Sequence, residues 1–277
     1  MRSLLAFLIL FVFSMALFAA DITSESEKIT DVQTIVTKAN LVAYYQGQDG
    51  KSNVTMTITD KKGQTRLREF IILRKDIEDG GDQNYYVYFL KPADVRKMVF
   101  MVHKHIDINK DDDRWLYMPS LDLVKRIAAS DKRTSFVGSD FLYEDVSGRN
   151  LIEDNHELME TNDQYYIVKN VPKAPDSVEF SYYNVSIDRQ TFVPMKMEFY
   201  DKNNRLYRTI ESQKVEMIEV KDGDKTEKLP TVVKSVVKDL NTGSTTDMEF
   251  NDVKYNINIG DVFTERYLRK PPMEAIR

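Results

Sequence analysis

Residues 53–74, NVTMTITDKKGQTRLREFIILR, decide the fold class. Val54, Met56 and Ile58 alternate with threonines, and this period of two is typical of a strand with one buried face. The turn-forming run DKKG follows at 60–63, and residues 66–74 return as a second strand. The segment therefore predicts an antiparallel hairpin.

Strand patterns of this kind continue along the chain. We predict further strands at 85–90, 98–103, 114–118, 123–128, 164–170, 178–188, 194–201, 205–219, 231–239 and 246–255, and a short helix at 139–146. Residues 98–102, MVFMV, are apolar on both faces, so we expect burial on both. Ten or more antiparallel strands at hairpin spacing imply a mainly β fold with a strongly curved sheet or a barrel.

Upstream of these strands, residues 29–45 carry apolar side chains at steps of three and four, which predicts one amphipathic helix. Ser26 or Thr30 could cap its start, and Gly47 lies just past its end. We expect this helix on the concave side of the sheet. One helix cannot fill so large a face, so either side chains or an apolar ligand must do so. The residues expected to face this concave apolar surface are Val54, Met56, Ile58, Phe70, Ile72, Tyr88, Phe100, Met197 and Phe199.

The first residues of the chain predict export. Arg2 precedes an apolar run at 4–18, and Ala19-Ala20 end it, as in a secretory signal peptide. We therefore expect a signal peptide at 1–20, cleaved or kept as an anchor, and a single exported domain at 21–277.

Composition narrows the classes of function. The chain has no cysteine, which excludes thiol catalysis and cysteine-ligated metals, and 39 Lys and Arg against 44 Asp and Glu do not suggest nucleic acid binding. His103 and His105 lie two apart, but no further metal motif accompanies them, and 111–113 (DDD) lacks the glycine and glutamate of a calcium loop. No Gly-x-Ser-x-Gly elbow occurs. We expect no catalytic residue, no metal and no cofactor.

Residues 111–149 mix aromatic and basic side chains most densely. One interpretation is a lip at the mouth of a cavity, where aromatic rings meet an acyl chain and cations meet an anionic headgroup or partner. The other is a hairpin and surface loop, with the single tryptophan as a core anchor and the basic residues in solvent. The residues concerned are Trp115, Tyr117, Phe141 and Tyr143, with Lys125, Arg126 and Arg133.

This stretch also carries a resemblance. It is similar to the LolA-like branch of the outer-membrane lipoprotein-sorting proteins in the run WLYMP at 115–119, the pair Arg126-Ile127 and the block FVGSDFLYED at 136–145. Residues 88–95, YFLKPADV, and 263–268, FTERYL, resemble the family too. One departure is Lys97-Met98, where a glycine is usual.

The resemblance implies an open, curved antiparallel sheet, or half-barrel, with helices over its concave face. It also implies a periplasmic carrier that binds acyl chains of lipoproteins or lipids, takes them from an inner-membrane transporter and gives them to an outer-membrane acceptor. Two alternatives stay open: a non-catalytic adaptor or accessory protein of a lipid-exporting membrane transporter, and an esterase acting on lipid. A continuous apolar cavity would favour the carrier, whereas a filled core would favour the adaptor.

Overall fold

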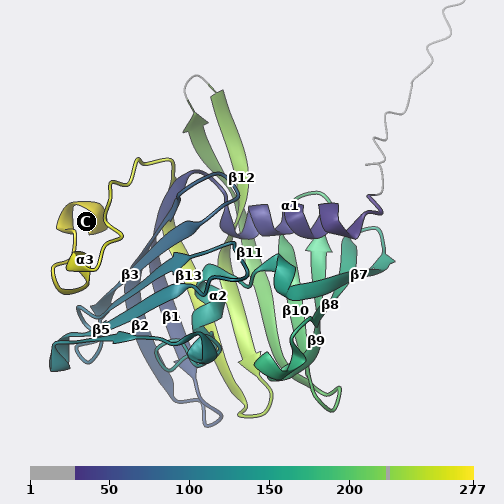
Figure 1. Ribbon diagram of the computed structural model, residues 1–277, viewed down its shortest axis with the longest axis horizontal. Coiled ribbons are helices and arrows are strands. Elements are labelled where there is room, and N and C mark those ends of the chain that lie inside the picture. Colours follow the sequence, from purple (N-terminus) through teal and green to yellow (C-terminus); the bar gives the residue numbers. More distant parts are fainter. Residues whose placement is uncertain (1–28, 223–224) are drawn as a thin grey trace, which may run out of the picture.

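The computed structural model describes residues 29–222 and 225–277, so the signal peptide expected at 1–20 and the cap expected at Ser26 lie outside the described residues. Thirteen strands form one antiparallel sheet in the order β6-β5-β4-β3-β2-β1-β13-β12-β11-β10-β9-β8-β7. At its centre β1 (Asp49–Thr59) pairs with β13 (Ser244–Tyr255), and its edges are β6 (Leu123–Arg126) and β7 (Asp154–Thr161). Because the two edges do not pair with each other, the curved sheet is open (Figure 1).

Neighbours in the chain are neighbours in the sheet on both sides of the central pair. One side holds β2 (Thr65–Asp76), β3 (Gln83–Lys91), β4 (Val99–Lys104) and β5 (Asp113–Met118). The other holds β8 (Tyr165–Pro172), β9 (Phe180–Asp188), β10 (Pro194–Asp201), β11 (Leu206–Asp222) and β12 (Lys225–Asp239). The predicted fold class is confirmed. One strand, β7, was not predicted, because its sequence DNHELMET lies at an edge and is mostly polar on both faces.

The predicted helix is α1 (Val32–Tyr44), which begins three residues later than expected. Asp31 is its cap, since its carboxylate accepts a hydrogen bond of 2.9 Å from the backbone nitrogen of Thr34. The helix lies on the concave side and buries Ile35, Val36 and Ala39 in a cluster with residues of β8, β9 and β10 (Figure 1). Within the described residues, no helix has the length and apolar character needed to cross a membrane.

Residues 127–153, here called the crossover segment, connect edge strand β6 to edge strand β7 across the concave face. The segment contains α2 (Tyr143–Ser147), which is shorter than the helix expected at 139–146. Phe136 and Tyr143 pack on Phe100 with ring centroids 5.5 and 5.0 Å away. The crossover segment thus supplies much of the core of this half of the sheet.

The convex face has a cover that the sequence did not predict. Residues 256–277, here called the C-terminal segment, contain α3 (Arg266–Arg269) and α4 (Met273–Ile276) and pack on strands β2 to β5. Phe263 and Leu268 are buried there, and the Tyr86 hydroxyl donates a 2.7 Å hydrogen bond to the carbonyl of Tyr267. This cover explains why residues 99–102 are buried on both faces, as their pattern predicted.

The departure at Lys97 leaves the local bend intact. Lys97 has φ of 70°, in the left-handed region where glycine is favoured, which accounts for the glycine usual at this point in LolA-like proteins. Its backbone nitrogen donates 2.8 Å to the carbonyl of Phe89, closing the turn between β3 and β4. The chain therefore keeps the turn with a residue that is strained in it.

Candidate functional site

An apolar cavity of about 320 Å³ lies between the end of α1, the crossover segment and the concave face of the sheet. Its volume falls within the range of about 300–1,000 Å³ that is usual for ligand pockets. The apolar side chains of its wall are Val42, Ala43, Phe70, Ile72, Phe136, Phe141, Val146, Val193, Met197, Phe199, Ile210, Val232, Met248, Phe250 and Val253.

The end of α1 forms part of this wall and is held by an arginine from the sheet. The guanidinium of Arg74 donates to the carbonyls of Tyr44, Gln46 and Gly47, at 2.7, 2.6 and 2.6 Å. The Tyr44 carbonyl is one of the free acceptors that a helix leaves at its carboxyl end, where a cation is favourable, and the other two carbonyls belong to the turn that follows α1. Arg74 also pairs with Asp76 at 2.9 Å. Burial raises the pKa of Asp76 to about 6, although Arg74 favours its charged form.

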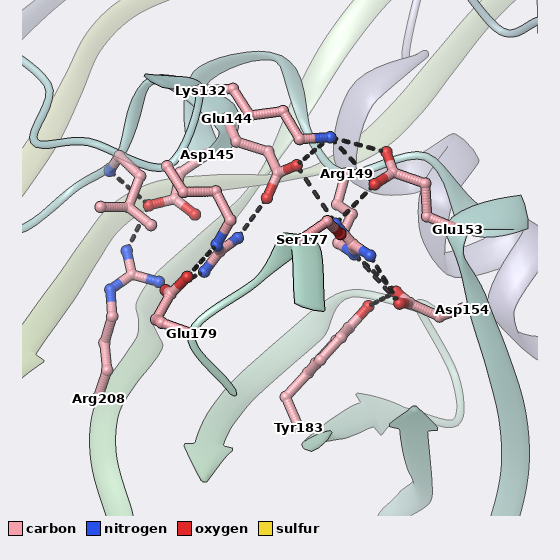
Figure 2. A network of polar contacts seen from close by, with 12 residues as sticks. Lys132, Glu144, Asp145, Arg149, Glu153, Asp154, Ser177, Glu179, Tyr183 and Arg208 are labelled. Atoms are coloured by element: carbon pink, nitrogen blue, oxygen red, sulfur yellow. Dashed lines mark hydrogen bonds and ion pairs between the residues drawn. The ribbon is translucent and has the colours of Figure 1, made fainter. Parts of the chain in front are cut away.

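The opposite part of the wall is a network of buried ion pairs around α2 (Figure 2). The carboxylate of Glu144 lies between Lys132 at 3.0 Å, Arg149 at 3.5 Å and Arg133, which is closer still. Arg133 continues to Glu179 at 2.6 Å. Burial favours the neutral form of Glu144, but the three cations outweigh it and lower the pKa of Glu144 to about 2.

Arg149 extends this network to the sheet. It pairs with Asp154 at 2.9 Å and with Glu153 at 2.7 Å, and the Tyr183 hydroxyl donates 2.8 Å to Asp154 (Figure 2). Since Asp154 begins β7 and Tyr183 lies in β9, the network fastens the crossover segment to this side of the sheet. A polar wall with all its charges paired can border an apolar cavity without exposing a free charge to it.

The block at 136–145 has a structural explanation on the other side of the segment. Asp140 accepts hydrogen bonds from the hydroxyls of Ser244 and Thr246, at 2.5 and 2.7 Å, both on β13. Asp145 accepts from the backbone nitrogen of Leu142 at 2.7 Å and pairs with Arg208 of β11. The motif thus pins the crossover segment over the concave face.

Eight of the nine residues expected on the concave face lie there. Phe70, Ile72, Met197 and Phe199 line the cavity. The other four are packed into the concave core beside it, namely Val54, Met56, Ile58 and Phe100. Whether any of them binds lipid stays a prediction.

The placement of Tyr88 was wrong. Tyr88 lies on the convex face, in the cluster that the C-terminal segment covers. Strand β3 is buried on both faces from residue 85 to 89, so apolar alternation could not assign the side of each residue.

The prediction that four aromatic residues lie together at the mouth of the cavity was also wrong. Trp115 and Tyr117 belong to the convex cluster under the C-terminal segment, whereas Phe141 and Tyr143 belong to the concave core. Of the four, Phe141 lines the cavity. Trp115 is 5% exposed, which fits the alternative interpretation of a core anchor.

The three basic residues assigned to the lip are dispersed. Lys125 and Arg126 are exposed on edge strand β6, and Arg126 pairs with Asp113 and lies over the Trp115 ring at 5.3 Å. Arg133 alone reaches the cavity, where both its partners are carboxylates. Because these three residues do not lie together, the structure does not support a common contact with a headgroup or a partner.

None of the three histidines lines the apolar cavity. His103 contacts the carbonyl of Phe263 on the convex face, His105 lies between Asp82 and Asp113, and His156 contacts Asn170 and Leu151. No described histidine contacts a serine or threonine hydroxyl, and the described residues hold no cluster of three or more potential metal ligands.

Sequence reasoning missed several cavity residues, among them Tyr44, Arg74, Ile210 and Phe250. Arg74 carried a signal, since a charge that ends an apolar strand needs a partner. Tyr44 gave none, because its place depends on how the end of α1 meets the sheet.

The comparisons with solved structures match this architecture. A DUF1329 family protein from Desulfovibrio piger is 28% identical with a TM-score of 0.75, over 86% of this chain and 98% of that one. An outer membrane lipoprotein-sorting protein domain from Vibrio parahaemolyticus is 23% identical with a TM-score of 0.71, over 86% and 97%. A LolA superfamily protein from Nitrosomonas europaea is 20% identical with a TM-score of 0.60, over 86% and 100%.

These likenesses define the class: the protein has a LolA-like fold, as its sequence motifs indicated. Residues 81–270, more than half of the chain, match a family model whose description reads only "uncharacterized protein"-like, and the chain belongs to that family. No curated protein sequence matches the chain.

Proposed function

We propose that this protein is a periplasmic carrier that binds acyl chains of lipoproteins or lipids in the apolar cavity and moves them toward the outer membrane. The observation that carries the proposal is the cavity, which leaves about 320 Å³ open among apolar side chains at the centre of the concave face. A protein that acted only as an adaptor would have no need to leave this space unfilled, since tight packing stabilises a core.

The energetics suit a carrier. Each methylene of an acyl chain costs about 0.8 kcal/mol when it stands in water, and a protein cavity offsets that cost. Met197, Phe199 and Phe250 supply the apolar wall, and a methionine adapts its shape to a variable chain. Release requires an opening, and α1, which buries three of its 13 side chains, is the covering element that we expect to open.

The expected route of the cargo follows from the predicted signal peptide at 1–20 and from the fold. An inner-membrane transporter would be the donor and an outer-membrane protein the acceptor, with transient membrane contact. The absence of cysteine removes the acylation site of a bacterial lipoprotein, which fits a protein that carries lipid without being anchored by one.

The two alternatives make different demands. A histidine-dependent esterase would need a histidine beside a nucleophile at the apolar cavity, and none of the three histidines lines that cavity. His105 lies between Asp82 and Asp113 instead. An accessory protein of a lipid-exporting transporter would not need the cavity in order to bind its partner. The carrier accounts for the cavity and needs no catalytic group.

The test compares two methionine-to-tryptophan variants. Met197 lines the cavity, and Met217 on the protruding part of β11 is 51% exposed, so M217W is the matched control for M197W. The added ring displaces about two methylenes of bound chain, about 1.6 kcal/mol, so we expect M197W to bind a fluorescent fatty acid about tenfold more weakly than wild type. M217W should bind as wild type does, and circular dichroism would verify that both variants fold.

Equal binding by wild type, M197W and M217W would place the probe outside the cavity and refute the proposal. A wild type that binds no acyl probe would refute it as well.

A further inference from the structure

A second cavity, here called the polar cavity, adjoins the apolar one and measures about 350 Å³. It lies between the end of β4, the β4–β5 loop, the crossover segment and the residues that follow β8. Glu144 and Arg149 line both cavities, so the two cavities meet at these side chains.

The floor of the polar cavity holds a buried lysine that lacks a counter-ion. Lys104 is 3% exposed, and its ammonium donates a 2.7 Å hydrogen bond to the carbonyl of Ser147 and lies 5.3 Å from the centre of the Tyr44 ring. No carboxylate of the described chain lies within ion-pair distance of it. Burial lowers the pKa of Lys104 to about 8, and the nearby Asp112 offsets only part of that. An ammonium has three donors, so two are left for a ligand.

Arg114 beside it also has an unused donor. Its side chain is 2% exposed and pairs with Asp112 at 2.5 Å, but its Nε atom has no hydrogen-bond partner. A buried guanidinium nitrogen without an acceptor is costly, so an acceptor bound in the polar cavity would relieve that cost.

The balance of charge around the polar cavity favours an anion. Its lining holds six Lys and Arg and five Asp and Glu. Three of the five carboxylates are already paired with cations, namely Asp112, Glu144 and Glu153. This leaves Lys104 on the floor and Lys110 and Lys173 on the exposed rim, against Asp107 and Asp111, also on the rim. The buried end of the cavity therefore carries the uncompensated positive charge.

We propose that the polar cavity binds a phosphate group at the head of an amphipathic lipid whose acyl chain occupies the apolar cavity. The inference rests on the proposed carrier function and narrows its cargo to lipids with an anionic phosphate head. A phosphate offers several oxygen acceptors and a negative charge, which match the free donors of Lys104 and Arg114. A neutral head would leave the Lys104 ammonium buried without a counter-ion.

The experiment compares two fluorescent probes with identical acyl chains, phosphatidic acid and diacylglycerol, on the full mature chain. Lys104→Met keeps the length of the side chain and removes its charge. Lys62→Met, on the exposed β1–β2 turn, is the matched control. We expect K104M to bind phosphatidic acid about tenfold more weakly, the effect of losing one charge-assisted contact, and to bind diacylglycerol unchanged. K62M should bind both probes as wild type does.

Lys173→Met provides a second variant on the exposed rim, where a fold defect is not expected. It should bind phosphatidic acid about threefold more weakly, since an exposed charge contributes less. If K104M fails to fold, the result with K173M decides, and unchanged phosphatidic acid binding by K173M would then overturn the proposal.

The remaining outcomes separate this inference from the carrier function. If wild type binds both probes and K104M alters neither, the phosphate site is refuted and the carrier stands. If wild type binds neither probe, both fail. Inorganic phosphate alone tests the free anion: we expect no rise in the thermal unfolding temperature, and a rise that K104M abolishes would assign the site to free phosphate and refute the lipid head.

Discussion

Glu144 is the central carboxylate of the ion-pair network that holds the crossover segment. Its side chain is 3% exposed, and its carboxylate forms ion pairs with Lys132, Arg133 and Arg149. Removing one member of a buried ion-pair network leaves the others unpaired, which costs about 3–5 kcal/mol.

We therefore expect Glu144→Gln to lower the free energy of unfolding by about 3–5 kcal/mol at pH 7. The folded-state pKa of about 2 lies below the ordinary value of 4.5, so ionised Glu144 stabilises the fold above pH 4.5, and this contribution is lost as pH falls from 4.5 through 2. Urea unfolding at pH 7 and at pH 3 measures both effects. The difference in free energy of unfolding between wild type and E144Q should be smaller at pH 3 than at pH 7. A larger difference at pH 3 would contradict the lowered pKa of Glu144.

Gly148 shows how closely the crossover segment meets α1. It has φ of +79°, and a Cβ there would stand 2.6 Å from the ring of Tyr44. Gly63 has φ of +77° with nothing within 4 Å of a Cβ, so it is a matched control for the backbone strain alone.

We expect Gly63→Ala to cost about 1 kcal/mol and Gly148→Ala about 1–3 kcal/mol more, since the second also overpacks against Tyr44. Thermal unfolding of the two variants checks this. Equal losses would mean that Tyr44 can move aside, and the end of α1 would then be less firmly held than the geometry indicates.

For single residues, the sequence predicted whether a side chain is buried better than it predicted the face of the sheet on which it lies. Trp115 was predicted at a cavity lip, and the structure instead supports the alternative of a core anchor. Met197 and Phe199 were placed on the concave face because apolar and charged residues alternate along residues 195–199. Tyr88 was misplaced because its neighbours are apolar on both faces. The donors of Lys104 and Arg114 were not foreseen, since nothing in a lone sequence tells which charges a fold buries.

Among the elements, α1 differs from the strands it covers. It buries three side chains, whereas residues 85–89 of β3 are all buried. Local opening is cheapest where few apolar contacts are made, so α1 should open more readily than the central strands. Val42, Ala43 and Tyr44 line the cavity, and this opening would therefore expose it.

We expect bound oleate to slow amide hydrogen exchange in α1. At about 100 times Kd, the ligand stabilises the closed form by about 2.7 kcal/mol, or about a hundredfold in exchange, if opening of α1 releases it. Exchange mass spectrometry reports this, with residues 85–89 of β3 as the internal control. If oleate slowed hydrogen exchange in β3 but not in α1, the assignment of α1 as the lid would be refuted.

The elements that the sequence predicted are those with a clear period. The strands of the hairpins and α1 were found within a few residues of their ends. Strand β7 was missed because an edge strand needs no apolar face, and α3 and α4 because four-residue helices are too short to show a period. The helices α3 and α4 are held by contacts with strands β2 to β5, which lie far away in the chain.

For the whole molecule, the two faces of the sheet have separate tasks. The concave face holds the cavities, and the convex face of β2 to β5 is sealed by the C-terminal segment. The sequence predicted the curved sheet, its helix and the burial of residues 98–102 on both faces. It did not predict what covers the convex face, because the segment that buries Leu73 and Met101 lies some 160 residues or more downstream in the chain.

Phe263→Ala tests this division of tasks. Phe263 is 3% exposed in the convex cluster, so its truncation should cost about 3–5 kcal/mol in urea unfolding. Acyl-probe affinity of the folded variant should stay as in wild type, because Phe263 does not line the cavity. A variant of full stability that binds the probe poorly would link the convex cover to the cavity and contradict the account.

Mass spectrometry of lipids that co-purify with the protein from its native cells tests most directly whether the apolar cavity holds an acyl chain. We expect acyl lipid in wild type and in M217W at about equal amounts, and a marked loss in M197W, because the new ring fills the cavity. Wild type free of acyl lipid, or M197W that retains as much as wild type, would contradict the proposed carrier function.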